Sequence, residues 1–160
     1  MAGWRQLAVP NYCERLIGFS VPHIDTVLVV SYEGMHLMRL GTPITVETDS
    51  EYGEYDLYDP DSGICRYQGR QWDIIGLFPG CPILAGCNEE QLVLNSETET
   101  VSVVRGNEEV WSANYENFSG DWVAVTFSPD SRFIVLGCPY DFDFRVWERI
   151  PDAGPVAGVE

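Results

Sequence analysis

The sequence contains no lysine, and nine arginines stand against 25 aspartates and glutamates in 160 residues. The net charge of −16 excludes the extensive basic face that binding to nucleic-acid phosphates requires. No apolar run approaches the roughly 20 residues of a membrane-spanning helix, and the first residues lack the apolar segment of a secretory signal. We therefore expect no nucleic-acid partner, no membrane partner and a cytoplasmic location.

Histidine is also scarce, with only His23 and His36 in the chain. It is the commonest general acid or base at neutral pH, and no nucleophile elbow, phosphate-binding glycine loop or His-Glu-x-x-His motif is present. His36 lies in a strand-like run and His23 follows a proline, so we expect a structural and a surface role. The sequence predicts a protein that is not an enzyme, with no catalytic residues and no cofactor. A carboxylate-dependent enzyme, with two acidic residues facing one pocket, is a third alternative.

Metal sites are not expected either. The five cysteines form an odd set without a C-x-x-C pair, which is poor spacing for zinc. We expect reduced thiols packed as small apolar side chains: Cys13, Cys65, Cys81, Cys87 and Cys138. Residues 59–63 begin like a calcium loop but lack its later acidic ligands, so we interpret them as a turn.

What the sequence does contain is short runs rich in β-branched and aromatic residues, separated by Gly, Pro, Asp, Asn and Ser. This pattern predicts an all-β fold. The expected strands are 26–31, 35–40, 44–48, 54–58, 73–78, 83–85, 91–94, 101–104, 122–127, 133–136 and 142–147. A weak helix is considered over 12–17, and residues 151–160 are expected to form a flexible tail.

A repeated motif is clearest between residues 121 and 148. A strand ending at Phe127 leads through Ser-Pro-Asp-Ser at 128–131 to a second strand that ends in Gly137-Cys138. The turn residue Asp141 and the closing run Arg-Val-Trp-Glu at 145–148 follow. This order resembles a repeat of the WD-repeat β-propeller family.

Two weaker copies precede this one. Residues 74–95 show the same order of strand, turn, strand, Gly-Cys pair and strand, with Gly86-Cys87 matching Gly137-Cys138. Residues 34–43 align without a gap with residues 130–139. Three copies of about 43 residues fit between residues 22 and 150, within the family's period of roughly 40 to 45.

The resemblance implies an N-terminal strand or arm at 1–21, a propeller unit at 22–150 and the tail at 151–160. The four-stranded blades would span approximately 22–68, 69–108 and 109–150. Seven residues receive structural roles within the repeats: Phe78, Gly86, Phe127, Asp130, Gly137, Asp141 and Trp147. The chain departs from the family in lacking the Gly-His pair before the first strand of the repeat, and the closing aspartate position varies.

Three blades are fewer than the four to eight that close a typical propeller. Closure hides edge strands, so three arrangements remain open. A second copy completes a six-bladed ring, a small ring closes within one chain, or the strands form another β arrangement. The first is favoured, as a homo-oligomer and most simply a dimer.

The densest charged stretch spans residues 49–61, with six carboxylates and three tyrosines. It forms either a solvated loop or a negative, aromatic surface for a basic partner. Aromatic residues elsewhere are candidates for an exposed face or a dimer seam. The candidate partner-binding residues are Glu51, Tyr52, Glu54, Tyr55, Asp56, Trp111, Tyr115 and Tyr140.

The resemblance implies a non-catalytic protein-binding or scaffold module that self-associates. The sequence does not identify its protein partner. The alternative is an acidic inhibitor or immunity-type protein that covers a basic site of its partner through residues 49–61. Charge reversal there would abolish binding by an inhibitor and spare a platform that binds through its central face.

Overall fold

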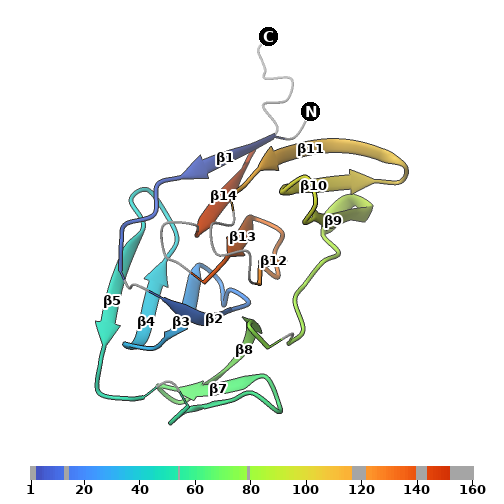
Figure 1. The fold of residues 1–160 in the computed structure, drawn as a ribbon. Helices are drawn as coiled ribbons and strands as arrows, with labels where there is room; N and C mark the ends of the chain where they lie inside the picture. The colour runs from blue at the N-terminus through green and yellow to red at the C-terminus, as the bar shows by residue number, and fades with distance from the viewer. Residues whose placement is uncertain are drawn as a thin grey trace.

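The computed structural model describes residues 3–12, 15–53, 55–78, 80–116, 122–139 and 144–151. In these ranges the chain forms three antiparallel sheets (Figure 1). The expectation of an all-β fold is confirmed. The described part of the chain contains no helix with the length and apolar character needed to cross a membrane.

The largest sheet has seven strands in the order β5-β4-β3-β2-β8-β7-β6. They are β2 (Leu16–Ser20), β3 (Thr26–Ser31), β4 (Gly34–Arg39), β5 (Thr45–Asp49), β6 (Tyr58–Asp59), β7 (Ile64–Tyr67) and β8 (Arg70–Gly76). The sheet curls into a half-barrel, and the Tyr67 hydroxyl of β7 donates a hydrogen bond to Oδ2 of Asp49 on β5 over 2.8 Å. The curl thus brings β7 close to the edge strand β5.

The other two sheets are smaller and come mainly from the second half of the chain. The four-stranded sheet has the order β1-β14-β13-β12, and the three-stranded sheet has the order β11-β10-β9. Their strands are β1 (Gly3–Leu7), β9 (Glu90–Asn95), β10 (Thr100–Arg105), β11 (Glu108–Asn114), β12 (Ala124–Phe127), β13 (Phe133–Gly137) and β14 (Arg145–Ile150). All five residues of β1 pair with β14, so the two ends of the described chain lie in one sheet (Figure 1).

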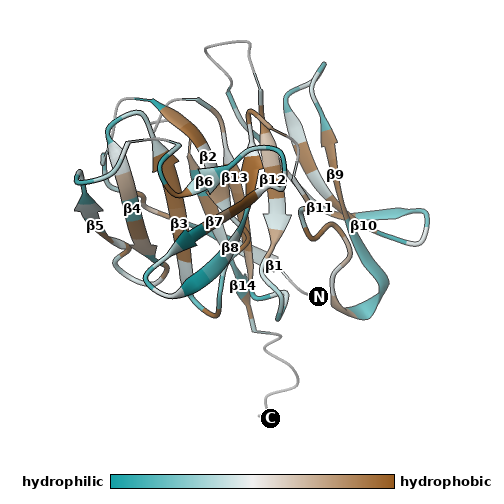
Figure 2. Cartoon of the chain, turned by 90° about the horizontal axis from the view of Figure 1, so that it is seen from below, coloured by the Kyte–Doolittle hydropathy of each residue, from teal (hydrophilic) through white to brown (hydrophobic). Residues whose placement is uncertain are grey.

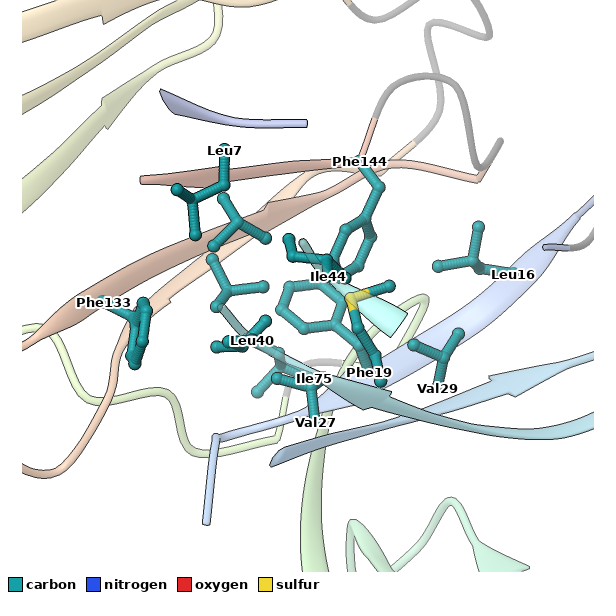
Figure 3. Packing of buried hydrophobic residues seen from close by; sticks show 13 residues of the cluster. Leu7, Leu16, Phe19, Val27, Val29, Leu40, Ile44, Ile75, Phe133 and Phe144 are labelled. Carbon is teal, nitrogen blue, oxygen red and sulfur yellow. The ribbon is translucent and has the colours of Figure 1, made fainter. Parts of the chain in front are cut away.

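Alternation along the central strands distributes their side chains between separate cores. On β13, Phe133 and Val135 enter a core shared with the seven-stranded sheet, whereas Ile134 and Leu136 enter a core shared with the three-stranded sheet. A third core fills the concave side of the half-barrel. Figure 3 shows side chains of the first core, including Phe19 and Phe144, pointing toward one another. The central strands are therefore apolar on both faces, which explains their uninterrupted hydrophobic runs.

The outward face of the three-stranded sheet is largely polar. Val93, Ser102 and Ser112 lie side by side across β9, β10 and β11, and on the same face Thr100 lies between Asn95 and Asn114. The inward residues Leu92, Val101 and Val103 pack against the four-stranded sheet. Figure 2 shows hydrophobic colouring concentrated in the central strands and hydrophilic colouring toward the ends of the outer hairpins. The three-stranded sheet is therefore an end layer of the stack.

A buried ion cluster joins this end layer to the four-stranded sheet. The Glu90 side chain is 1% exposed and accepts hydrogen bonds from Nη2 and Nη1 of Arg149 at 2.6 and 3.1 Å. Arg105 donates a third at 3.2 Å, and Arg149 lies 4.4 Å from the centre of the Trp4 ring. Burial raises the pKa of Glu90, but the hydrogen bonds and charges of Arg149 and Arg105 outweigh it and hold the pKa below its ordinary value of 4.5.

The two Gly-Cys pairs lie where a phenylalanine approaches from a neighbouring segment. A Cβ atom on Gly137 would lie 2.5 Å from Cε1 of Phe19, and one on Gly86 would lie 2.8 Å from Cε2 of Phe127. Both glycines therefore permit close packing at the level of the backbone. The close approach of a phenylalanine ring explains why glycine occupies the same position in both Gly-Cys pairs.

The remaining residues expected to have structural roles have different surroundings. Phe127 and Trp147 are buried, and Phe78 is half-buried and lies 6.2 Å from the Tyr58 ring. Asp130 accepts hydrogen bonds from the Ser128 hydroxyl and the Arg132 N–H within the β12–β13 turn. Asp141 lies outside the described residues.

Several expected elements need correction. Leu16 and Ile17 begin β2 instead of ending a helix, and a strand over 54–58 is wrong because residues 55–57 form turns and β6 begins at Tyr58. Around residues 83–85 the structure has a single bridge from Ala85 to Gln91. The strands β7 and β11 are absent from the expected elements, and β1 and β2 both fall in the segment 1–21, for which a single N-terminal strand or arm is expected.

The sheets also differ from the expected limits of the blades. β8, within 69–108, pairs with β2 outside it, and β11 pairs with β10 although most of it falls in 109–150. The four-stranded sheet is completed by β1 from the N-terminal segment. A long-range pairing thus supplies the fourth strand of this sheet.

Candidate functional site

A groove of about 540 Å³ follows the edge strand β5. We call it the acidic groove, and it is lined by Leu37, Glu47, Thr48, Asp49, Ser50, Glu51, Tyr67 and Gln68. β5 is the terminal strand of its sheet and pairs with β4. The groove therefore combines three carboxylates with an exposed sheet edge.

The alternation of β5 places two of these carboxylates on the same face. Val46 packs against the core shared with the four-stranded sheet, so Glu47 and Asp49 point to the opposite, concave side. Glu47 lies opposite Leu37, which packs against the core of the half-barrel. Asp49 Oδ1 accepts a hydrogen bond from the Glu51 N–H over 3.0 Å, which positions the third carboxylate.

Tyr67 forms the opposite wall of the groove. Burial, followed by the hydrogen bond to Asp49 and the charge of Asp49, raises the pKa of Tyr67 to about 12. The hydroxyl therefore stays protonated at neutral pH and keeps donating to Asp49. The Tyr52 ring meets the Tyr67 ring edge-on with 6.3 Å between their centres, so this wall is aromatic.

The structure places the predicted residues of the 49–61 segment differently. Glu51 is exposed and lines the groove, and Tyr52 is half-buried beside it. Tyr55 is 47% exposed and stacks on Tyr58 at 6.3 Å. Asp56 is exposed and accepts a hydrogen bond from the Gly53 N–H over 2.7 Å, which holds the loop closed. Glu54 lies outside the described residues.

The aromatic candidates elsewhere do not join this surface. Trp111 is half-buried between Trp4 and Trp147, with ring centres 6.0 and 5.3 Å apart respectively. Tyr115 is 3% exposed in the same core, so neither forms an exposed aromatic face. Burial, with smaller contributions from Cys138 and Glu99, raises the pKa of Tyr115. Tyr140 lies outside the described residues.

Sequence reasoning missed Glu47, Tyr67 and Gln68 as groove residues. Glu47 could have been found, because the expected strands 35–40 and 44–48 form a hairpin that places it beside Asp49. Tyr67 and Gln68 could not, since β7 was not expected and the curl depends on the packing of distant strands.

Both histidines lie where the sequence predicted. His36 is 1% exposed, with Nε2 2.7 Å from the Ser31 hydroxyl and Nδ1 2.9 Å from the Thr48 hydroxyl. It therefore links β3, β4 and β5 beneath the groove. His23 is exposed, and its Nε2 lies 2.6 Å from Nη1 of Arg70.

The cysteines divide into two groups. Cys65 and Cys138 are buried, as expected, and burial raises the pKa of Cys65 to about 11. Cys81 and Cys87 are exposed, so the expectation of packed thiols is wrong for them. Cys13 lies outside the described residues. Within the described ranges, no group of three or more His, Cys, Asp or Glu side chains is arranged to hold a metal ion.

The Asp59 segment forms the expected turn. The carbonyl of Asp59 accepts a hydrogen bond from the Gly63 N–H at 2.8 Å, and its Oδ1 accepts one from the Asp61 N–H at 3.1 Å. These two hydrogen bonds close the turn that reverses the chain between β6 and β7.

No protein-family model matches the chain, and no curated protein or solved structure matches it significantly. The WD-repeat resemblance therefore stays a prediction.

Proposed function

We propose that this chain is a non-catalytic protein-binding module with a propeller-like arrangement of sheets, and that its acidic groove receives a basic segment of a partner protein. The observation that carries the proposal is the set of Glu47, Asp49 and Glu51 along an exposed edge strand. An arginine or lysine side chain complements these carboxylates. Among the described strands β5 has only β4 beside it, so its outer edge can also pair with an extended peptide.

The net charge of −16 adds to this proposal. A strongly negative surface accelerates encounter with a basic partner and disfavours acidic ones. Tyr55, four residues after Glu51 in the chain, supplies exposed aromatic area, and tyrosine is enriched at binding hot spots. The second candidate, an inhibitor that covers a basic site, would use the same surface.

The propeller-like part of the proposal is supported by the stacking of the sheets. One core lies between the seven-stranded and four-stranded sheets, and another lies between the four-stranded and three-stranded sheets. β12 of the four-stranded sheet contacts β8 of the seven-stranded sheet and β9 of the three-stranded sheet. The pairing of β8 with β2 is a departure from separate blades. We therefore propose an open stack within one chain in place of a ring completed by a second copy.

We expect light scattering to give a mass of 18.0 kDa at two protein concentrations, the mass of one chain. The outward face of the three-stranded sheet is polar, and at the other end the seven-stranded sheet curls over its own core. In the described residues, neither end offers an extended apolar face on which a further blade would stack; Val93 is an isolated exposed apolar side chain there. Twice the monomer mass would instead support the ring-completing dimer.

Reversal of two groove charges, Glu47→Arg with Glu51→Arg, is expected to weaken binding of a fluorescent arginine-rich peptide about tenfold or more. The matched control, Glu97→Arg with Glu108→Arg, changes the net charge equally at exposed positions of the three-stranded sheet and its hairpins. Fluorescence anisotropy at physiological salt measures both affinities.

The control variant is expected to bind within about threefold of the native chain, because exposed distant charges are screened. Equal weakening by both variants would show that the peptide responds to overall charge, and would overturn the groove as the binding site. If a natural partner binds the Glu47→Arg, Glu51→Arg variant as tightly as it binds the native chain, the result favours a platform that binds through another face.

A further inference from the structure

A second pocket, of about 510 Å³, lies where β1 and β14 meet the turn between β12 and β13. We call it the arginine pocket, and its walls include Arg5, Cys87, Ser131, Arg132, Glu148 and Arg149. It shares no lining residue with the acidic groove.

The charge of this corner differs from that of the chain as a whole. Four of the nine arginines gather here around three carboxylates. The arginines are Arg5, Arg105, Arg132 and Arg149, and the carboxylates are Glu90, Asp130 and Glu148. In a protein of net charge −16, the pocket lining thus brings the three arginines Arg5, Arg132 and Arg149 together with the two carboxylates Asp130 and Glu148.

The arginines have two distinct roles. Arg149 is fixed by Glu90, and its Nε donates a hydrogen bond to the Ser131 carbonyl over 3.0 Å. Arg5 and Arg132 share Glu148, with contacts of 2.6 and 3.4 Å, and their side chains are 61% and 53% exposed. A guanidinium has five N–H donors, so these two exposed groups keep donors that face solvent.

Cys87 is held at the wall of the same pocket. Its backbone N–H donates a hydrogen bond to the Ser131 hydroxyl over 2.9 Å, and its thiol is exposed. The Asn88 amide donates to its Sγ at 3.6 Å. The Cys87 backbone is thus tied to the turn that carries Arg132, and the thiol donates a hydrogen bond to Oε1 of Glu90 at 4.0 Å.

We infer that the arginine pocket binds a small oxyanion, a carboxylate or phosphate group, through Arg5 and Arg132, with the Cys87 thiol beside the bound group. Guanidinium forks match the geometry of such oxyanions and bind them with charge-assisted hydrogen bonds. Glu148 contacts both guanidiniums, while the second lining carboxylate, Asp130, already accepts hydrogen bonds from the Ser128 hydroxyl and the Arg132 backbone N–H. The inference is independent of the partner-binding proposal, because it concerns different residues and the opposite charge.

The test compares two thiol reagents that differ in charge. In each case the thiolate displaces iodide and forms a carbon–sulfur bond, but iodoacetate is an anion and iodoacetamide is neutral. Peptide mass spectrometry measures both rates at Cys87 and at Cys81, an exposed thiol that is not among the lining residues of the pocket. The ratio of the iodoacetate rate to the iodoacetamide rate is expected to be about fivefold higher at Cys87 than at Cys81.

Two variants move this ratio in opposite directions. Arg5→Gln with Arg132→Gln should reduce the ratio at Cys87 to that at Cys81, whereas Glu148→Gln should raise it. Arg39→Gln with Arg66→Gln, which changes two exposed arginines elsewhere, should leave it unchanged. Inorganic phosphate at about 10 mM should slow iodoacetate at Cys87 more than it slows iodoacetamide.

Equal ratios at the two cysteines in the native chain would overturn the inference. The inference would also be overturned if the Arg5→Gln, Arg132→Gln variant kept the native ratio of iodoacetate rate to iodoacetamide rate at Cys87. The ratio at Cys81 reports the general effect of net charge, and circular dichroism confirms that each variant is folded.

Discussion

Glu90→Gln is expected to lower the free energy of unfolding by about 3 kcal/mol, because removing one partner of a buried ion pair leaves the other charge uncompensated. The carboxylate is 1% exposed and holds Arg149, whose side chain is 17% exposed. Glutamine keeps the shape of the side chain. However, it carries no charge, and only one of its two terminal groups can accept a hydrogen bond from the guanidinium. Urea denaturation at neutral pH measures the loss.

Glu148→Gln is the matched control, since it removes a glutamate that also binds two arginines. Its partners Arg5 and Arg132 are more than half exposed, so we expect a loss below about 1 kcal/mol. Equal losses from both variants would contradict the role assigned to the buried cluster.

The acid dependence gives a second readout for Glu90. Its pKa is lower in the folded chain than its ordinary value of 4.5, which the unfolded chain has, so its stabilisation is fully present above that value. That stabilisation is lost as the pH falls through the lower, folded value. The difference in unfolding free energy between the native chain and Glu90→Gln should therefore shrink on acidification below about pH 4.

Gly137→Ala is expected to cost about 2 kcal/mol of unfolding free energy by overpacking. The added Cβ would lie 2.5 and 2.8 Å from two ring carbons of Phe19, and 3.2 Å from Cδ2 of Phe144. Phe19 is fully buried, so its ring can shift only by disturbing the core between the two larger sheets. Urea denaturation again measures the effect.

Gly41→Ala is the control, because its Cβ would meet its nearest atom, the Pro43 carbonyl oxygen, at an ordinary 3.7 Å. A second test replaces Phe19 with leucine in the Gly137→Ala background. The double variant should lose less stability than the two single losses added together, because the smaller side chain relieves the clash. Strict additivity would show that Phe19 is not what Gly137 accommodates.

The strands that could be predicted from the sequence are those with an uninterrupted apolar pattern. β3 and β13 are buried on both faces, so their hydrophobic runs stand out. β11 alternates glutamate, serine and asparagine with apolar residues at the edge of its sheet, and it was missed. The pairings of β1 with β14 and of β2 with β8 join distant segments, and no local pattern encodes them.

The candidate site shows the same division. Glu51 and Tyr52 could be selected from the charged stretch itself, but Tyr67 comes to the groove through the curl of the sheet. Trp111 is a candidate for an exposed face or a dimer seam only as long as β11 is missing from the expected strands. Once that strand is known, its pairing with β10 places Trp111 opposite the inward-facing Val103.

The pairing of β1 with β14 also limits when the four-stranded sheet can form during synthesis of the chain. Arg5 and its partner Glu148 are 143 positions apart, a distance that translation covers in roughly ten to thirty seconds. Throughout that interval Trp4 and Leu7 have been synthesised but their partner strand has not. The four-stranded sheet therefore cannot be completed until β14 emerges, and until then the Trp4 and Leu7 side chains of β1 lack the strand against which they pair.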